Sequence, residues 1–193
     1  MPLSEYKSNL IEEKWYKQWL ENNLFFANPE NSEEPFSVVM PPPNVTGKLH
    51  IGHALNMTLQ DISVRYKRMK GFNTLWLPGF DHAGIATQWV VTRQLEEKGI
   101  NRFDLGREKF IQKVWEWVPI ARDAIKKQIE RLGASCDWSK KRFTLDEGFA
   151  RAVRYAFSNL YKNGYIFKAP YIVNWDPKDR TAISDLEVEY EEE

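Results

Sequence analysis

The chain has 193 residues, of which 42% are hydrophobic and 14% aromatic, which is enough for one substantial domain or two small ones. Lysine plus arginine and aspartate plus glutamate both number 27, so no overall positive charge indicates a protein that binds nucleic acid. A single cysteine excludes an internal disulfide framework, and the sequence has neither an apolar signal segment nor a membrane-spanning run. We therefore expect a globular protein of the cytoplasm.

Residues 8–23 predict an amphipathic N-terminal helix. Ile11, Trp15 and Trp19 recur every four residues between charged side chains, which places them on one face of a helix. We expect this face to dock the helix on the rest of the protein through its aromatic rings. Residues 28–35 are polar and acidic and predict a loop.

A strand, a rigid loop and a helix follow in order. Residues 36–40 are apolar and β-branched, as in a buried parallel strand, and the prolines at positions 41–43 must stop that strand. Beyond the loop, a helix is predicted from about residue 50 to residue 70, ending before Gly71. Its apolar side chains recur at helical spacing, at Leu55, Leu59, Ile62, Tyr66 and Met69.

Two histidines, His50 and His53, lie one turn apart at the start of this helix. Unpaired backbone N–H groups and the helix dipole favour an anion such as phosphate there. Gly52, between the histidines, leaves open surface on which a purine ring could rest. The alternative is that both histidines only cap the helix. A metal site gets little support, because the single cysteine, Cys136, lies far along the chain.

A second strand and helix repeat this pattern. Residues 74–77 predict a buried strand that stops at Pro78, and a helix begins near residue 83. Alternating strands and helices indicate an α/β fold with a parallel sheet. Ligands bind such sheets beyond the carboxyl ends of the strands, so the loops at residues 41–47 and 78–82 should be neighbours.

Asp81 lies in the second of these loops and has two interpretations. An aspartate just before a helix usually caps that helix. A carboxylate held near a small apolar cleft can instead pair with the ammonium group of an amino acid. The residues alone leave both interpretations open.

The second half of the chain predicts two further helices and one more strand. Apolar spacing predicts a helix over residues 107–132, with a kink at Pro119, and another over residues 146–163. The basic residues 140–142 form either a patch that faces RNA or an ordinary solvated charged face. Residues 171–175 predict a third strand.

Residues 43–53, Pro-Asn-Val-Thr-Gly-Lys-Leu-His-Ile-Gly-His, resemble the "HIGH" signature of class I aminoacyl-tRNA synthetases. Residues 77–88, Leu-Pro-Gly-Phe-Asp-His-Ala-Gly-Ile-Ala-Thr-Gln, are similar to the valyl branch of that family, as are residues 174–175 and 183–189. The resemblance covers essentially the whole chain, but only the first part of the family's much longer sequence. It implies an α/β fold that is the first half of a Rossmann-like parallel-sheet nucleotide-binding domain.

The resemblance implies ATP-dependent activation of valine as a valyl-adenylate, and ligation of the valine to tRNA(Val). Mg²⁺ would arrive with ATP, bound mostly by phosphates and water. The residues implied at the phosphates, and so in catalysis, are Thr46, His50 and His53. Asn44 and Gly52 are implied as further ATP-binding residues, with Gly52 against the adenine. The residues implied at the amino-acid end are Pro41, Pro42, Asn44 and Asp81.

The chain also departs from the family pattern. Where the family often has C-x-x-C, residues 176–179 are Asp-Pro-Lys-Asp, so we expect no protein-bound zinc. The second family signature, Lys-Met-Ser-Lys-Ser, and the editing domain are absent, so the chain resembles an N-terminal fragment. The alternative function is therefore a catalytically inert fragment that binds nucleotide and amino acid. A pure RNA-binding protein is disfavoured by the zero net charge.

We expect a monomer with three parts. Residues 1–35 would be an N-terminal helix and loop, and residues 36–175 the first half of the catalytic domain. Residues 176–193 would begin a connection toward the editing insertion of the family.

Overall fold

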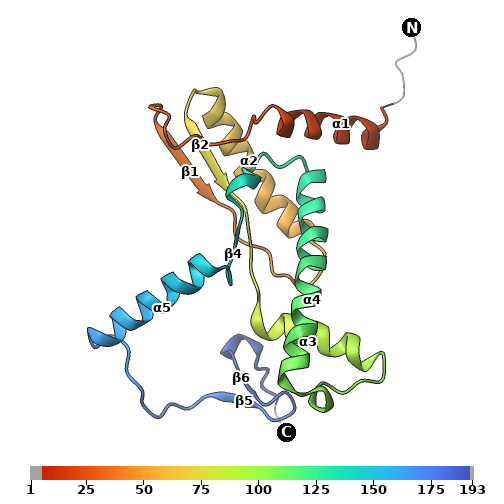
Figure 1. The fold of residues 1–193 in the computed structure, drawn as a ribbon, viewed down its shortest axis with the longest axis vertical. Helices are drawn as coiled ribbons and strands as arrows, with labels where there is room; N and C mark the ends of the chain where they lie inside the picture. Colours follow the sequence, from red (N-terminus) through yellow and green to blue (C-terminus); the bar gives the residue numbers. More distant parts are fainter. Residues whose placement is uncertain (1–5, 192–193) are drawn as a thin grey trace. The chain divides into compact units, whose positions relative to one another are not determined.

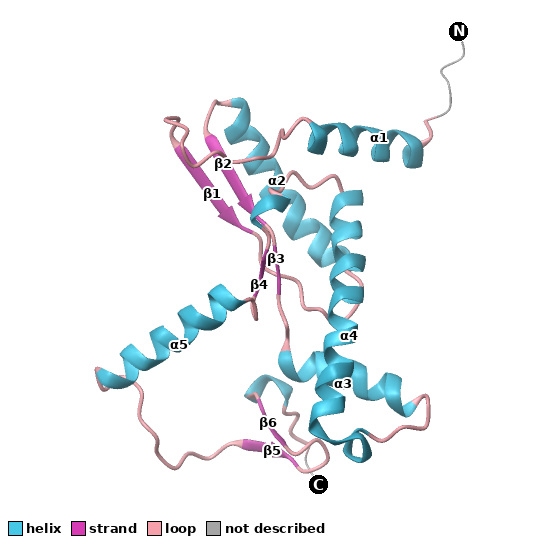
Figure 2. Ribbon diagram, viewed as in Figure 1, coloured by secondary structure: helices cyan, strands magenta, loops and turns pink. Residues whose placement is uncertain are grey.

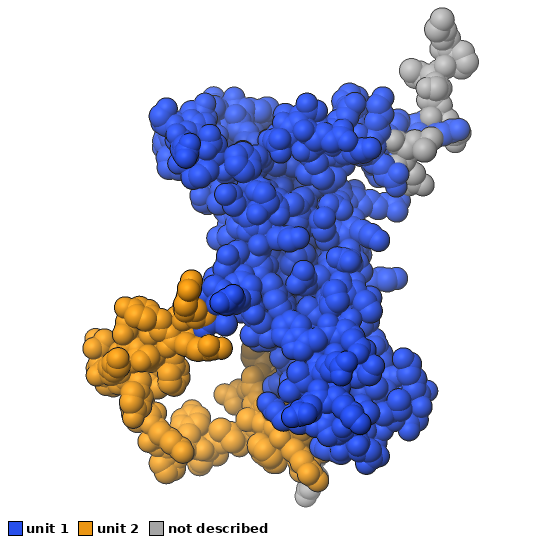
Figure 3. Space-filling view, in the orientation of Figure 1, with its two compact units in different colours: residues 1–150 blue, residues 151–193 orange. Residues whose placement is uncertain are grey.

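The computed structural model describes residues 6–191, and the chain divides into two compact units (Figure 3). The first unit comprises residues 1–150, and the second comprises residues 151–193. The first unit carries the two motif loops, which are residues 41–47 and 78–82. The domain boundaries after residues 35 and 175 stay a prediction. Among the described residues, no helix is long and apolar enough to cross a membrane.

Helix α1 (Ser8–Glu21) confirms the predicted N-terminal helix, but two of the three residues predicted to dock it do not (Figure 1). Ile11 and Trp15 are exposed, whereas Trp19 is half-buried, with its ring against those of Tyr16 and Phe25. Tyr16 is buried. The Tyr16 hydroxyl donates to the carbonyl of Ala134 (3.0 Å). The surface that α1 meets therefore presents a polar backbone group, which a tyrosine can satisfy and a purely apolar side chain cannot.

Two parallel strand pairs form the centre of the first unit (Figure 2). β1 (Pro35–Val39) pairs in parallel with β2 (Asn73–Leu77). Beyond Pro78 the chain continues as β3 (Gly79–Phe80), which pairs in parallel with β4 (Arg142–Phe143). β2 ends at Leu77, so the prediction that this strand stops at Pro78 is confirmed. Proline lacks only the backbone donor, and its carbonyl accepts a hydrogen bond from the first residue of β4 (3.1 Å).

β1 is less buried than predicted. Its side chains alternate between exposed and half-buried, with Val39 67% exposed and with Phe36 and Val38 packed against the core. The strand is therefore covered on one face only. The fully buried side chains of the core include Met40, Val45, Trp76, Ile125 and Ile129.

Helix α2 (Ile51–Met69) packs on β1 and β2 and ends, as predicted, before Gly71, whose φ is 84°. Its apolar stripe is not the buried face, because all five of its side chains are more than half exposed: Leu55, Leu59, Ile62, Tyr66 and Met69. Met57 and Val64 are the residues that α2 buries. The periodicity thus predicts the helix correctly but not the face that meets the core.

A polar network joins α2 to the segment that follows α4. Asp61 Oδ1 accepts from Ser135 N (2.9 Å), and Asp61 Oδ2 accepts from Arg65 Nε (2.6 Å). Arg68 donates to the hydroxyl and to the carbonyl of Ser135 (2.7 and 2.8 Å). Since Ser135 is fully buried and its polar groups must be paired, the network fixes this part of α2 on the unit.

Helices α3 (Gly84–Glu96) and α4 (Arg102–Arg131) complete the helical part of the first unit. The helical backbone of α4 breaks at Gly106 (φ 73°, ψ 164°), directly before the predicted helix start at residue 107. Glycine adopts a positive φ at low cost. The kink at Pro119 stays a prediction. A short 3-10 turn (Trp138–Lys140) then leads into β4.

Helix α5 (Glu147–Lys162) confirms the last predicted helix. In the second unit, β5 (Asn174–Asp176) and β6 (Thr181–Ile183) form an antiparallel hairpin, followed by a 3-10 turn (Asp185–Glu187). The prediction of a strand over residues 171–175 is wrong for its first three residues. The regular segment starts later because its pairing is set by the turn, where Asp176 Oδ1 accepts from the backbone N–H of residue 178 (2.9 Å).

Candidate functional site

The two motif loops lie side by side beyond the strands, as predicted. Asp81 N donates to the carbonyl of Pro43, and Val45 N donates to the carbonyl of Asp81, both at 2.9 Å. Asn44 and Asp81 consequently form an isolated parallel bridge. Val45 is fully buried, and its carbonyl accepts from Trp117 Nε1 on α4 (2.8 Å). These contacts fix the backbones of the two loops against each other.

Helix α2 begins with a reciprocal cap made by two histidines. His50 is the N-cap, and its Nδ1 accepts from Gly52 N (3.1 Å), while His53 Nδ1 accepts from His50 N (3.3 Å). Both histidines therefore cap the helix, and their contact with phosphate stays a prediction. The cap leaves the second nitrogen of each ring available, because a neutral imidazole whose Nδ1 accepts carries its proton on Nε2. Each ring can cap the helix and donate to a ligand at the same time.

The surroundings of His53 favour this neutral form. The pKa of His53 is lowered by desolvation and, to a smaller extent, by the nearby His50. The ring centroids of the two histidines are 4.0 Å apart, so two charged rings would repel each other. The first turn of α2 contains no acidic side chain that would compete for an anion. The helix start therefore offers neutral N–H donors together with the positive end of the helix dipole.

Gly52 has a steric role in this cap. A Cβ atom at this position would lie 2.9 Å from His50 Cε1 and 3.1 Å from His50 Nδ1. The glycine thus allows the His50 ring to fold over the start of the helix. The predicted contact of Gly52 with adenine stays a prediction.

Asp81 does not cap α3, so that interpretation is wrong. The N-cap is Ala83, in the left-handed region (φ 47°), and no side chain caps the helix. Asp81 Oδ1 accepts from Ala83 N and from Thr144 Oγ1, both at 3.1 Å. Within residues 6–191 no hydrogen bond reaches Oδ2, and the Asp81 side chain is 36% exposed. One carboxylate oxygen is held by the protein, and the other is open to a cation.

Thr144 and His82 complete this half of the site. Thr144 Oγ1 accepts from His82 N (2.9 Å) and lies 2.5 Å from His82 Nδ1. Thr144 was not among the predicted residues, and it is 63 residues from Asp81 along the chain. It follows β4, a strand of two residues that is too short to show an alternating pattern. No local signal could have found it.

The remaining predicted residues lie along the first loop. Pro41 and Pro42 are exposed, and Thr46 is half-buried in the turn before α2. Pro42 lines an apolar hollow of about 60 Å³, which Thr144 also lines. Asp81 does not line this hollow, and Thr144 links the two through its hydrogen bond to Oδ1.

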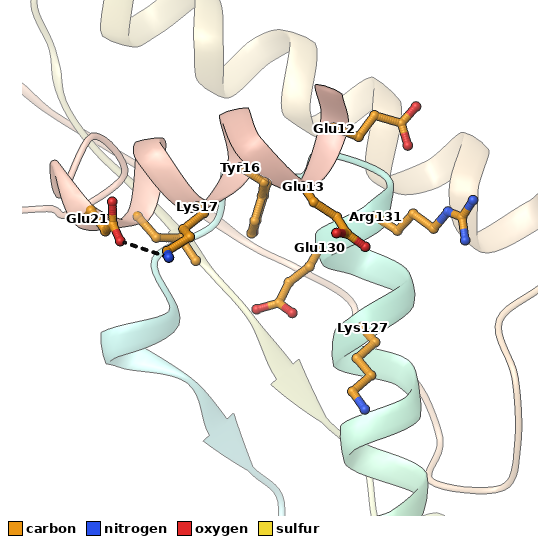
Figure 4. Close-up of a pocket in the computed structure, with 9 residues that line it drawn as sticks. Glu12, Glu13, Tyr16, Lys17, Glu21, Lys127, Glu130 and Arg131 are labelled. Atoms are coloured by element: carbon orange, nitrogen blue, oxygen red, sulfur yellow. Dashed lines mark ion pairs between the residues drawn. The ribbon is translucent and has the colours of Figure 1, made fainter. Parts of the chain in front are cut away.

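A wider hollow of about 560 Å³ lies between α1 and the end of α4 (Figure 4). Its charged lining mixes both signs, with Glu12, Glu13, Glu21 and Glu130 beside Lys17, Lys127 and Arg131. None of the predicted site residues lines it. In the part of the chain that the structure describes, no group of three or more histidine, cysteine, aspartate or glutamate side chains is arranged to hold a metal ion.

Basic residues near β4 have partners within the first unit. Lys140 lies over the ring of Phe26 (5.5 Å), and Arg142 pairs with Asp146 (2.9 Å). The backbone N–H of Phe149 is the main cause that lowers the pKa of Asp146. An RNA-facing patch at this place stays a prediction.

Residues 14–193 match the family described as tRNA synthetases class I (I, L, M and V), so the chain belongs to that family. Within it, the chain is 60% identical to a valine--tRNA ligase of Aquifex aeolicus over all of its length, and 57% identical to that of Pseudothermotoga lettingae over 98% of it. The valine--tRNA ligase of Solibacter usitatus is 58% identical over 95% of the chain. The chain spans only 17% to 22% of the length of these relatives.

The fold is also similar to that of a LeuRS of Agrobacterium radiobacter, solved as a ternary complex with tRNA and LeuAMS. The TM-score is 0.76, the identity 23%, and the match covers 94% of this chain and 21% of that one. At this identity the likeness supports the fold alone. The expected α/β fold, part of a Rossmann-like class I catalytic domain, is confirmed.

Proposed function

We propose that this chain forms the part of a valine-activating site that binds the phosphates of ATP and the ammonium group of valine. In the complete protein, the activated valine would pass to tRNA(Val). The observation that carries the proposal is the junction of the two loops, where Asn44 pairs with Asp81 beside the start of α2. The identity to valine--tRNA ligases supports valine as the amino acid.

The phosphate end would consist of His50, His53 and Thr46. In the reaction, a carboxylate oxygen of valine attacks the α-phosphorus of ATP, and the bond to the pyrophosphate oxygen breaks. Such a transfer needs charge stabilisation and positioning rather than a covalent nucleophile. The Nε2–H groups of the two histidines, with the hydroxyl of Thr46, would donate to phosphate oxygens. Mg²⁺ belongs to the substrate MgATP and is bound mostly by phosphates and water.

The amino-acid end would consist of Asp81 and the proline loop. The open Oδ2 of Asp81 would accept hydrogen bonds from the valine ammonium group, while Pro41 and Pro42 contact the apolar side chain. Asn44 would lie between the two ends, since its backbone pairs with that of Asp81. Gly52 would support the adenine.

The alternative is a fragment that binds both ligands without turnover. It is favoured by one observation, the small share of the relatives' length that this chain spans. The two functions differ in one measurement, valine-dependent exchange of pyrophosphate into ATP. Exchange slower than about 1 per second would support the fragment, and faster exchange would support the complete activation reaction. A monomer located in the cytoplasm stays our prediction.

Calorimetric titrations of MgATP and of valine test the proposal. We expect His50→Ala to weaken ATP binding and leave valine binding unchanged, and Asp81→Asn to do the reverse. Each loss should be roughly tenfold or more, since hydrogen bonds to charged groups contribute about 1.5–3 kcal/mol. Thermal unfolding of each variant controls for folding. Unchanged binding of both ligands in both variants would refute the proposed site.

A further inference from the structure

We propose that Thr144 is a positioning residue for the substrate-binding carboxylate: its hydroxyl holds Oδ1 of Asp81, and so fixes the orientation in which Oδ2 meets the substrate ammonium group. This inference rests on the proposed function, because it takes Asp81 to bind the ammonium group. Thr144 lies outside the motifs from which the site was predicted, whereas His82 directly follows Asp81 within one of them.

The hydrogen bonds of Thr144 can be assigned by counting donors. Its hydroxyl has one proton to donate and two lone pairs that accept. It has three partners, namely the backbone N–H of His82 (2.9 Å), His82 Nδ1 (2.5 Å) and Asp81 Oδ1 (3.1 Å). All three are satisfied together only if His82 Nδ1 carries a proton and donates it to Thr144. The single proton of Thr144 then goes to Asp81.

This assignment also settles the roles of the two carboxylate oxygens. Oδ1 accepts from Thr144 and from Ala83 N, which uses both of its lone pairs. An incoming ammonium group therefore finds its free acceptors on Oδ2. The carboxylate cannot turn without losing two hydrogen bonds, so its orientation is fixed before the substrate arrives. Preorganisation of this kind lowers the cost of binding.

Removal of the hydroxyl would change the hydrogen bonds that orient Asp81. His82 Nδ1 lies 3.3 Å from Asp81 Oδ1, close enough to pair with it directly. In the wild-type chain the shorter contact to Thr144 occupies this nitrogen. Without the hydroxyl, His82 would donate to Oδ1 in its place, from another direction, and the carboxylate would lose the orientation in which Oδ2 meets the substrate ammonium group.

The scaffold holds Thr144 firmly in this place. Thr144 directly follows β4, and its backbone N–H donates to the carbonyl of Phe80 (3.1 Å). The neighbouring Phe143 is buried in the core. The hydroxyl is therefore aimed by a paired, anchored segment, as a positioning role requires.

The test is a cycle of variants of the 193-residue chain, titrated with valine. We expect Thr144→Val to bind valine about tenfold more weakly, and Thr144→Ser to restore binding to within about twofold. The double variant Thr144→Val/Asp81→Asn should bind no more weakly than Asp81→Asn alone, because Thr144 acts through Asp81. The matched control is Thr92→Val, which removes a hydroxyl bonded to the Gln88 carbonyl on α3 and should change nothing.

Nuclear magnetic resonance of the His82 ring nitrogens gives a readout that is independent of substrate. We expect a protonated Nδ1 in the wild-type chain, and a changed Nδ1 signal in Thr144→Val but not in Thr92→Val. An unchanged Nδ1 signal in Thr144→Val, or additive losses of valine affinity in the cycle, would overturn the role of Thr144 and leave the proposed function standing. Normal valine binding by Asp81→Asn would instead overturn the proposed function, and the positioning role with it.

Discussion

The two halves of the candidate site are built in opposite ways. At the start of α2, each capping bond joins residues two or three positions apart, His50 to Gly52 and His53 to His50. At the second loop, Asp81 depends on Thr144, 63 residues away. The first half can form wherever the helix forms, whereas the second requires β3 and β4 to be paired. We therefore expect the two halves to respond differently to the same kind of damage.

The largest effect should come from Phe143→Ala, which removes the buried anchor of β4. Truncation of a buried phenylalanine costs about 3 kcal/mol of unfolding free energy. In the fraction that stays folded, valine affinity should fall because Thr144 loses its place, while ATP affinity should persist. Urea unfolding and separate titrations measure these effects. Phe103→Ala, at a 61% exposed position, is the matched control. An equal loss of affinity for valine and for ATP would contradict the separation of the two halves.

A smaller effect is expected from Gly52→Ala, which damages only the local half. The new methyl group would push the His50 ring away, and ATP affinity should fall about tenfold if the ring donates to phosphate. The unfolding free energy should change little, because alanine favours a helix over glycine by about 1 kcal/mol, which offsets the lost cap. Gly84→Ala, at the start of α3, meets nothing within 4 Å and serves as the control. Normal ATP binding by Gly52→Ala would argue against ligand contact by His50.

His50→Asn should separate capping from ligand binding at one position. Asparagine is a good N-cap residue, so the unfolding free energy should stay within about 0.5 kcal/mol of the wild type. It lacks the Nε2–H donor in this place, so ATP affinity should fall roughly fivefold. Calorimetry measures the ATP affinity, and thermal unfolding measures the stability. If ATP affinity survives and only His50→Ala reduces stability, His50 is a capping residue alone.

The smallest effect is the dependence of stability on pH through His53. Its pKa is lowered from the ordinary 6.5, first by desolvation and then by His50, so the unfolded chain takes up a proton before the folded chain does. The contribution of neutral His53 to the unfolding free energy is therefore fully present above about pH 6.5. It is lost as the pH falls through the lower pKa that His53 has in the folded state. Urea unfolding at about pH 7.5 and about pH 5.5 should show this loss in the wild type and less of it in His53→Asn. If the unfolding free energy of His53→Asn fell with pH as much as that of the wild type, His53 would not be a cause of the pH dependence.

The same division explains what the sequence could predict. The prolines at 41–43, the histidine pair and Gly71 act within a few residues of their own position, so the loop, the helix start and the helix end were predicted correctly. β4 was missed because two residues carry no period, and Thr144 was missed with it. The docking face of α1 was predicted correctly only at Trp19, and the buried face of α2 was not predicted, because the packing partners of a helix decide which of its faces is buried. The buried Tyr16, for example, donates a hydrogen bond to the carbonyl of Ala134, which lies 118 positions away along the chain.

Cys136, the single cysteine of the chain, is fully buried directly after Ser135 in the network that holds α2. Burial raises the pKa of its thiol to about 12, so almost no reactive thiolate exists in the folded chain at neutral pH. A thiol reagent can therefore label this side chain only after the surrounding structure opens. The rate at which the reagent labels Cys136 therefore measures how often this part of the structure opens, without an engineered probe. Ligands that bind only the folded chain should slow the labelling of Cys136. The labelling rate would then report how much of the candidate site is occupied.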